Sequence, residues 1–205
     1  MTHDSFSDLV LLSVCMGIAY RCLTVHRERA GVGIACLLIG IAAFLGVIRF
    51  SDWKPIHELA EGPHRFASTI AAVGAFPILA YSLAFPKSPI ATRLAGAWWF
   101  TFVVGGFGMA VWLLGFKLWA QIVPALCALW MAVSVAGGCR GRRLGLGIAG
   151  LVFLFASFGV TLFLPASTRV LGIFKSIQMF HYFLATALAL IALATVPPTP
   201  PESAR

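Results

Sequence analysis

The sequence has few charged residues. Asp, Glu, Lys and Arg together make up 11% of the 205 residues, whereas 60% of the residues are hydrophobic. A soluble domain carries roughly a quarter charged residues. A chain this short also has too much surface for its volume to hide so many apolar side chains from water. The composition therefore excludes a water-soluble domain and predicts a protein embedded in a membrane.

Patterns typical of several other classes are missing as well. The five cysteines contain no Cys-x-x-Cys pair, which argues against a disulfide framework and against a thiolate zinc site. The net charge of +8 does not come from a basic stripe with interleaved aromatic residues, so we expect no nucleic-acid partner. No basic region precedes the first apolar run, so we expect no cleaved signal peptide.

The chain does contain seven apolar runs, each close to the roughly 20 residues that a helix needs to cross the hydrocarbon layer. These runs cover residues 6–20, 32–49, 66–85, 94–116, 118–137, 144–164 and 174–196. We therefore predict an all-α fold, with a single domain over residues 1–196 that holds seven transmembrane helices. Residues 197–205 are rich in proline, which cannot continue a helix, and are expected to form a disordered cytoplasmic tail.

Two local features should shape these helices. The fourth and fifth runs touch at residues 115–117, and more than about forty apolar residues are too many for one crossing, so we expect a tight turn at Lys117. Pro77 and Pro124 lie inside the third and fifth runs. Because proline removes a backbone donor and clashes with the preceding turn, both should kink their helices.

Basic residues between the runs predict the orientation of the chain, because short cytoplasmic loops are enriched in Lys and Arg. Such residues follow the first, third and fifth runs: Arg21, Arg27, Arg29, Lys87, Arg93, Arg140, Arg142 and Arg143. Five of the seven acidic residues fall on the opposite side. We predict an outer N-terminus and an inner C-terminus, and the short loops suit a bacterial inner (cytoplasmic) membrane.

The longest polar connection joins the second and third runs at residues 49–65. Asp52 can cap a helix, Pro55 suits its first turn, and Gly62 followed by Pro63 forms a stop signal. We therefore expect a short interfacial helix of two turns on the outer membrane surface.

Histidines and carboxylates gather on the predicted outer side. His3, Asp4 and Asp8 begin the first run there. His57 lies on the expected interfacial helix, and His64 begins the third run. Four of the five histidines share this side.

His181 lies near the outer end of the seventh run, inside an apolar stretch. Ionisable groups at membrane depth are costly and tend to face a cavity or a partner. Zinc takes three or four imidazole or carboxylate ligands, and an open position creates a hydrolytic site. The predicted zinc ligands are His57, His64 and His181, with Glu61 or Asp52 as general base. The substrate would be a lipid from the outer leaflet.

This layout resembles the seven-transmembrane superfamily of alkaline ceramidases, adiponectin receptors and haemolysin III proteins. The resemblance is carried by His57 or His64 near the start of the third helix and by His181 early in the seventh. It implies a zinc ion held by three histidines near one membrane face and hydrolysis of lipid amides. The family's second histidine in the seventh helix is replaced here by Ala185.

Other interpretations remain open. His64 and His181 could serve a haem or a quinone, as axial ligands or as hydrogen-bonding groups in an electron-transfer protein. Alternatively, His181 could simply bond Gln178 or a neighbouring helix, in a noncatalytic accessory, receptor or scaffold subunit of a membrane complex. Ion-coupled transport is disfavoured because no charged residue lies in the middle of a run. The expected partners are membrane lipids and other membrane subunits.

Overall fold

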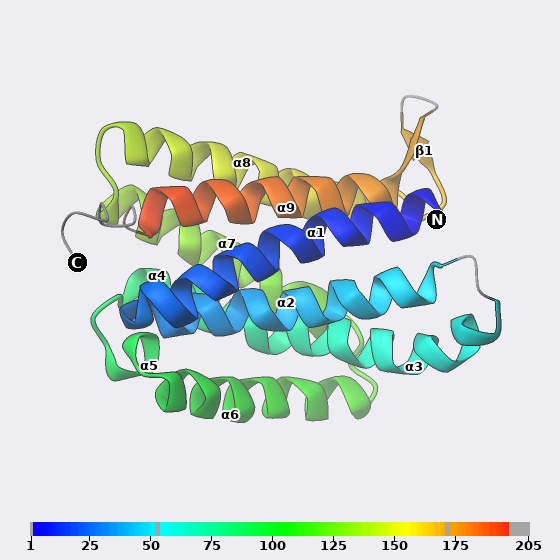
Figure 1. The fold of residues 1–205 in the computed structure, drawn as a ribbon, viewed down its shortest axis with the longest axis horizontal. Helices are drawn as coiled ribbons and strands as arrows, with labels where there is room; N and C mark the ends of the chain where they lie inside the picture. Colours follow the sequence, from blue (N-terminus) through cyan, green and yellow to red (C-terminus); the bar gives the residue numbers. More distant parts are fainter. Residues whose placement is uncertain (1, 52–53, 171–172, 197–205) are drawn as a thin grey trace.

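The computed structural model describes residues 2–51, 54–170 and 173–196, and these form a helical bundle (Figure 1). Its α-helices are α1 (His3–Tyr20), α2 (Ala30–Arg49), α3 (Lys54–Ile70), α4 (Phe76–Ala84), α5 (Pro89–Thr92), α6 (Leu94–Leu113), α7 (Trp119–Gly138), α8 (Arg142–Phe163) and α9 (Ser176–Thr195). Two π-helical turns, η1 (Arg21–Val25) and η3 (Ala71–Ala75), and a 3-10 turn, η2 (Arg27–Arg29), join some of them. The tail 197–205 lies outside the described residues.

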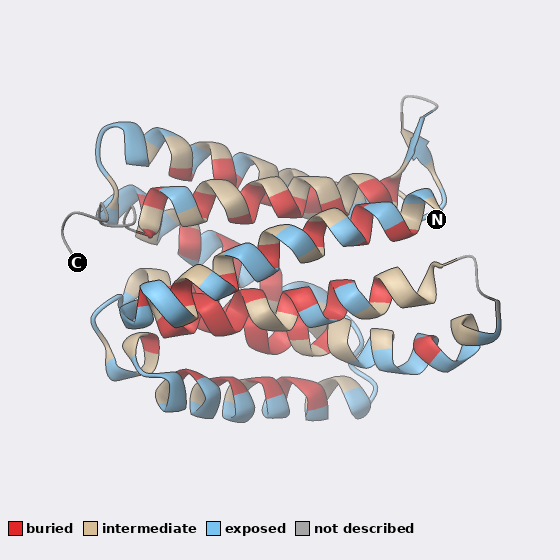
Figure 2. Cartoon of the chain, viewed as in Figure 1, coloured by how far each residue is buried: buried red, intermediate tan, exposed pale blue. Residues whose placement is uncertain are grey.

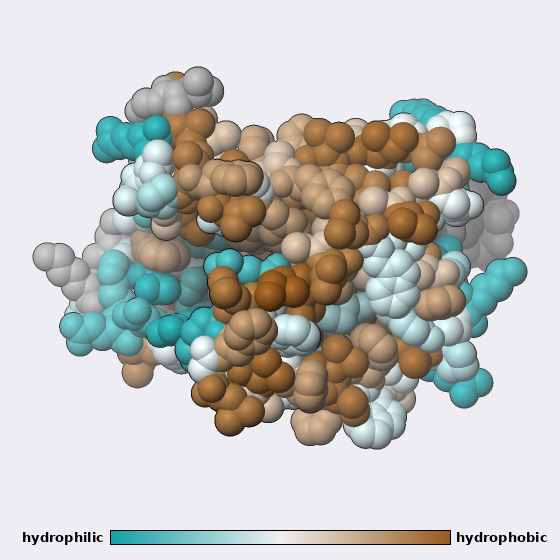
Figure 3. All heavy atoms as spheres, turned by 180° about the vertical axis from the view of Figure 1, so that it is seen from behind, coloured by the Kyte–Doolittle hydropathy of each residue, from teal (hydrophilic) through white to brown (hydrophobic). Residues whose placement is uncertain are grey.

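The all-α prediction with seven long apolar helices is confirmed. Within the described residues, seven helices are long and apolar enough to cross a membrane: His3–Val25, Arg27–Arg49, Pro55–Ala84, Leu94–Leu113, Trp119–Gly138, Arg142–Phe163 and Ser176–Thr195. Figure 3 shows hydrophobic atoms over most of the middle of one face and hydrophilic atoms mainly toward two ends. Outward-facing side chains such as Phe102, which is 77% exposed, suit contact with lipid chains.

The helices run along the long axis of the molecule, and α2 lies near the centre (Figure 1). It packs against α1, α3, α4 and α6, while α9 packs against α1 and α8. Residues Ala30–Cys36 of α2 are accordingly buried (Figure 2). We call the end that holds the N-terminus and the start of α9 the N-terminal end. The other, which holds α5 and the connection from α7 to α8, is the opposite end.

The prediction of a separate interfacial helix of two turns is wrong. Helix α3 begins at Lys54 and continues through Gly62 and Pro63 to Ile70, and the span that includes it extends to Ala84. Pro63 cannot donate to the carbonyl of Leu59, but this turn is not buried, and Leu59 is 76% exposed. One lost backbone hydrogen bond at an exposed turn does not end the helix.

A π turn accommodates Pro77 further along the same span. The N–H of Phe76 donates to the carbonyl of Ala71, five residues earlier, and so closes η3. Pro77, at the start of α4, has no N–H for the carbonyl of Val73. Local widening to a π turn is a common response of a helix to such a disruption. The turn at Lys117 is confirmed: α6 ends at Leu113 and α7 begins at Trp119.

One short element was not expected. Strands β1 (Arg169–Val170) and β2 (Phe174–Lys175) pair antiparallel between α8 and α9. This hairpin stands at the N-terminal end of the bundle (Figure 1) and leads directly into α9.

Candidate functional site

A cavity of about 270 Å³ lies in the N-terminal half of the bundle, among α1, α2, α3, η3, α4, α7, α8 and α9. Most of its lining is apolar, and the side chains include Leu11, Ile39, Phe76, Phe158, Leu162 and Leu184. Three ionisable side chains also line it: Asp8, His64 and His181. We call this space the histidine cavity. None of the described residues that line it is Lys or Arg.

Asp8 and His181 face each other across the contact between α1 and α9. Both side chains are buried, and His181 Nδ1 lies 3.3 Å from Asp8 Oδ1. The same ring nitrogen lies 3.1 Å from Ser7 Oγ. Ser7 donates its hydroxyl proton to the carbonyl of Asp4, over 2.8 Å, so its oxygen must accept from His181.

This network assigns the proton of neutral His181 to Nδ1. The other nitrogen, Nε2, then carries a lone pair and accepts a hydrogen bond. No described residue is recorded as its partner. The serine and the carboxylate share one nitrogen of His181, so the group is not a nucleophilic triad, in which they bond opposite nitrogens.

Gly46 on α2 makes room for the Asp8 carboxylate. A Cβ atom at position 46 would lie 2.6 Å from Asp8 Oδ2, far closer than van der Waals contact. Asp8 Oδ2 is buried and has no hydrogen-bond partner among the described residues. Leaving a buried acceptor unpaired destabilises the fold.

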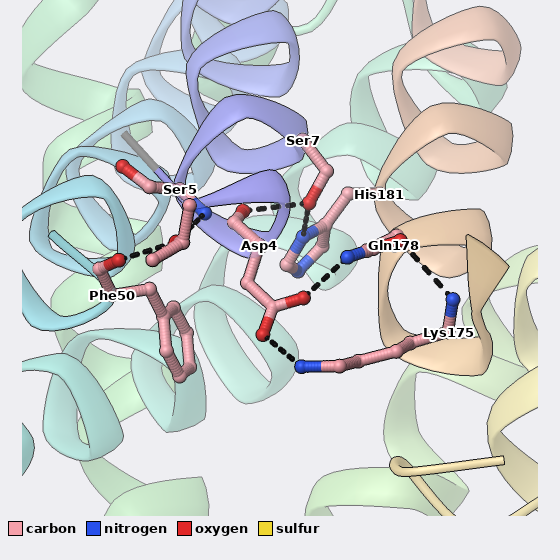
Figure 4. A network of polar contacts seen from close by, with 8 residues as sticks. Asp4, Ser5, Ser7, Phe50, Lys175, Gln178 and His181 are labelled. Carbon is pink, nitrogen blue, oxygen red and sulfur yellow. Dashed lines mark hydrogen bonds and ion pairs between the residues drawn. The ribbon is translucent and has the colours of Figure 1, made fainter. Parts of the chain in front are cut away.

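A second set of polar contacts fixes α1 against its neighbours near the cavity (Figure 4). Asp4 Oδ2 accepts from Lys175 Nζ over 2.7 Å, and Asp4 Oδ1 accepts from Gln178 Nε2 over 2.5 Å. Ser5 donates to the carbonyl of Val47 on α2 over 3.1 Å. Gln178 therefore bonds Asp4 rather than His181. These contacts hold α1 in the register that places Asp8 opposite His181.

His64 reaches the cavity from α3 and has a different partner. Its Nδ1 lies 3.1 Å from Arg49 Nη1. Arginine can only donate, so Nδ1 of His64 accepts and the proton of neutral His64 sits on Nε2. Arg49 Nη2 also lies 3.3 Å from Glu61 Oε1. The predicted general base Glu61 is thus held in an ion pair, and its side chain is 62% exposed.

The structure brings together two of the three predicted zinc ligands. His64 and His181 line the same cavity, but His57 does not. Instead, His57 Nε2 donates to the carbonyl of Ser51. Because one continuous helix joins them, His57 and His64 are separated by seven residues, or about 10 Å of helix axis. Asp52, the other predicted base, lies outside the described residues.

These positions do not fit the predicted metal site. Across residues 2–51, 54–170 and 173–196, no group of three or more His, Cys, Asp or Glu side chains could hold a metal ion. The sequence placed Asp8 on the same side as the histidines but gave it no role in the site, and Ser7 was missed. Asp8 lies inside the first apolar run, and an acid at membrane depth was the signal that could have found it.

Comparison of the chain with protein families, with curated proteins and with solved structures finds no match.

Proposed function

We propose that this chain is an integral membrane protein that binds a neutral, oxygen-bearing amphiphile in the histidine cavity, and that the ligand is a quinone or its quinol. The observation that carries the proposal is the placement of His64 and His181, from different helices, in the lining of one largely apolar cavity. Such a cavity with a few polar groups is typical of small-molecule sites.

The hydrogen-bonding capacity of the two rings favours this class of ligand. His64 offers Nε2–H as a donor, and His181 offers Nε2 as an acceptor. A quinone carries carbonyl oxygens, which accept, and a quinol carries hydroxyl groups, which also donate. The quinol can therefore bond both rings and the quinone can bond His64, while the ring and tail of either form can lie against apolar side chains such as Phe76 and Phe158.

The charge of the cavity argues against a phospholipid headgroup. Phosphate groups are held by Arg and Lys, and the described lining contains neither, whereas it does contain the carboxylate of Asp8. Burying a phosphate in a lining without a cation would leave its charge unpaired in a medium of low dielectric. A neutral headgroup avoids this cost.

We propose the orientation predicted from the basic loops, with the N-terminus outside and the cavity toward the outer leaflet of a bacterial inner membrane. Reporter fusions to the C-terminus test it. A fluorescent protein that matures only in the cytoplasm should be bright, and alkaline phosphatase, which is active only outside, should be inactive. The reverse result would contradict this orientation.

Binding of a short-chain ubiquinone analogue to the purified protein in lipid nanodiscs tests the function. Wild-type protein should bind both the oxidised and the quinol form of the analogue saturably. His64→Gln should weaken binding of both forms by about tenfold, because it removes the Nε2–H donor, whereas His181→Gln should weaken binding of the quinol alone by about tenfold, because the acceptor Nε2 can bond only a hydroxyl group. His57→Gln is the matched control, since His57 lies at the same end but outside the lining, and should bind as wild type does.

The same preparation separates the alternatives. Stoichiometric zinc that is lost in His57→Gln would overturn the quinone proposal in favour of the lipid hydrolase. A Soret band in the absorption spectrum would indicate a bound haem and would overturn the quinone proposal. Absence of quinone binding together with a stably co-purifying subunit would favour the accessory role.

A further inference from the structure

We propose a second binding site, for a phosphate group, in a cavity of about 350 Å³ at the opposite end of the bundle. Three arginines from separate segments line it: Arg29 in η2, Arg140 in the connection after α7, and Arg143 in the first turn of α8. We call this space the arginine cavity. The proposal does not depend on the quinone site.

The positive charge of the arginine cavity is not neutralised within the described chain. No Asp or Glu is among its lining residues. Of the described acidic residues, only Glu28 belongs to this end, and its carboxylate lies 3.4 Å from His26 Nδ1. No described acidic side chain forms an ion pair with Arg29, Arg140 or Arg143.

Arg29 supplies a more specific observation. Its Nε is buried and has no hydrogen-bond partner among the described residues. An arginine presents several N–H donors in one plane, a geometry that matches the oxygens of a phosphate. The buried Nε of Arg29 is thus a donor without an acceptor among the described residues, in a side chain that lines the cavity together with Arg140 and Arg143.

The position of the arginine cavity along the bundle also fits a phosphate. Its lining includes Gly138 and Thr195, the last residues of α7 and α9. Helix ends lie at the level of lipid headgroups when the helices cross the bilayer. Basic pockets between transmembrane helices bind lipid phosphates at this level. The phosphate could come from an anionic lipid or from a soluble phosphate compound, because the recognition chemistry is the same.

Native mass spectrometry of the full-length protein in detergent distinguishes the two sources. The probes are phosphatidic acid, phosphatidylcholine, and diacylglycerol, which lacks phosphate, with inorganic phosphate and pyrophosphate as soluble competitors. We expect retention of phosphatidic acid over diacylglycerol. Displacement of the lipid by pyrophosphate would identify a site for soluble phosphates, and resistance to displacement would identify a lipid site.

Substitutions assign the binding to the arginine cavity. Arg29→Gln, Arg140→Gln and Arg143→Gln should each lower retention of phosphatidic acid, or of pyrophosphate, by about tenfold through loss of charge-assisted hydrogen bonds. Arg142→Gln is the matched control, because Arg142 adjoins Arg143 but is not among the lining residues. Circular dichroism checks that each variant is folded.

An equal loss in Arg142→Gln would show that only the general charge of this end attracts the probe, and would overturn the proposal. Equal retention of diacylglycerol and phosphatidic acid, with no binding of either soluble phosphate, would overturn it as well. Selective loss in the three lining variants supports it.

Discussion

The two cavities of this bundle treat their ionisable side chains in opposite ways. In the histidine cavity each imidazole uses one nitrogen for a protein partner: His181 bonds Ser7 and Asp8, and His64 bonds Arg49. In the arginine cavity the guanidinium groups of Arg140 and Arg143 have no recorded ion pair among the described residues. Internal hydrogen bonds fix the proton on each histidine, whereas the arginines leave nearly all their donors to a ligand.

This difference determines the class of ligand that each cavity suits. Oriented rings in an apolar lining select a neutral molecule by the pattern of its donors and acceptors. Unpaired guanidinium groups at the end of the bundle select a ligand by its charge. Any anion of suitable size can accept some of the hydrogen bonds that they donate.

The largest expected effect is on quinone binding when Asp8 is removed. Asp8→Ala takes away one partner of His181 Nδ1, so the ring loses its fixed orientation. Affinity for the quinol form of the analogue should fall about tenfold, as it does in His181→Gln, because Asp8 acts through the orientation of the His181 ring. Titration in nanodiscs measures it.

The double variant Asp8→Ala/His181→Ala should bind no more weakly than either single variant, because the two residues act as one unit. Glu58→Ala serves as the control, since Glu58 is an exposed carboxylate at the same end and outside the cavity lining. Additive losses in the double variant would contradict the coupling between Asp8 and His181.

A substitution on α2 should disturb the histidine cavity without changing any polar group. In Gly46→Ala the new methyl group would lie 2.6 Å from Asp8 Oδ2, so the carboxylate must move. We expect a loss of about 1–3 kcal/mol of stability, typical of overpacking, together with weaker quinone binding. Thermal unfolding in detergent measures the first effect.

Gly17→Ala is the matched control for Gly46→Ala. Gly17 lies in α1, and a Cβ atom there meets nothing within 4 Å. Alanine favours the helix over glycine by up to about 1 kcal/mol, so this variant should be at least as stable as wild type. If both variants behaved alike, the space at Gly46 would not be what admits Asp8.

Salt concentration should affect ligand binding in the two cavities differently, and the effect should be smaller than those above. Between about 0.01 M and about 1 M salt the Debye length falls from about 30 Å to about 3 Å. Retention of phosphatidic acid should then weaken by about fivefold, because its attraction to the arginines is electrostatic. Quinone binding should stay constant, since the ligand is neutral. Equal salt dependence would remove the distinction between the cavities.

The smallest effect is expected at the ion pair that joins α9 to α1. Lys175 Nζ lies 2.7 Å from Asp4 Oδ2, but the lysine side chain is 44% exposed. Exposed pairs contribute less than about 1 kcal/mol, so Lys175→Gln should lower stability by less than that. Unfolding in mixed micelles measures it, with exposed Lys87→Gln as control. A loss of several kcal/mol would contradict the expectation that this pair contributes no more than an exposed ion pair does.

The helical spans were predictable because the requirement for a span is local: about 20 consecutive apolar residues. The end of α3 was not, since the sequence Gly62-Pro63 is a stop signal only where the lost hydrogen bond cannot be tolerated, and here the turn is exposed. Continuity of α3 also places His57 about 10 Å along the axis from His64, which separates two of the predicted zinc ligands.

The sequence by itself determined the seven apolar helices and the end of the bundle at which His64 and His181 lie, since both follow from the order of apolar and polar residues. Only the tertiary structure decided which side chains meet. Asp8 reaches His181 because α1 packs against α9 and because Gly46 leaves room for the carboxylate. Length along a helix is fixed by residue number, but the rotation of each helix about its axis depends on its neighbours.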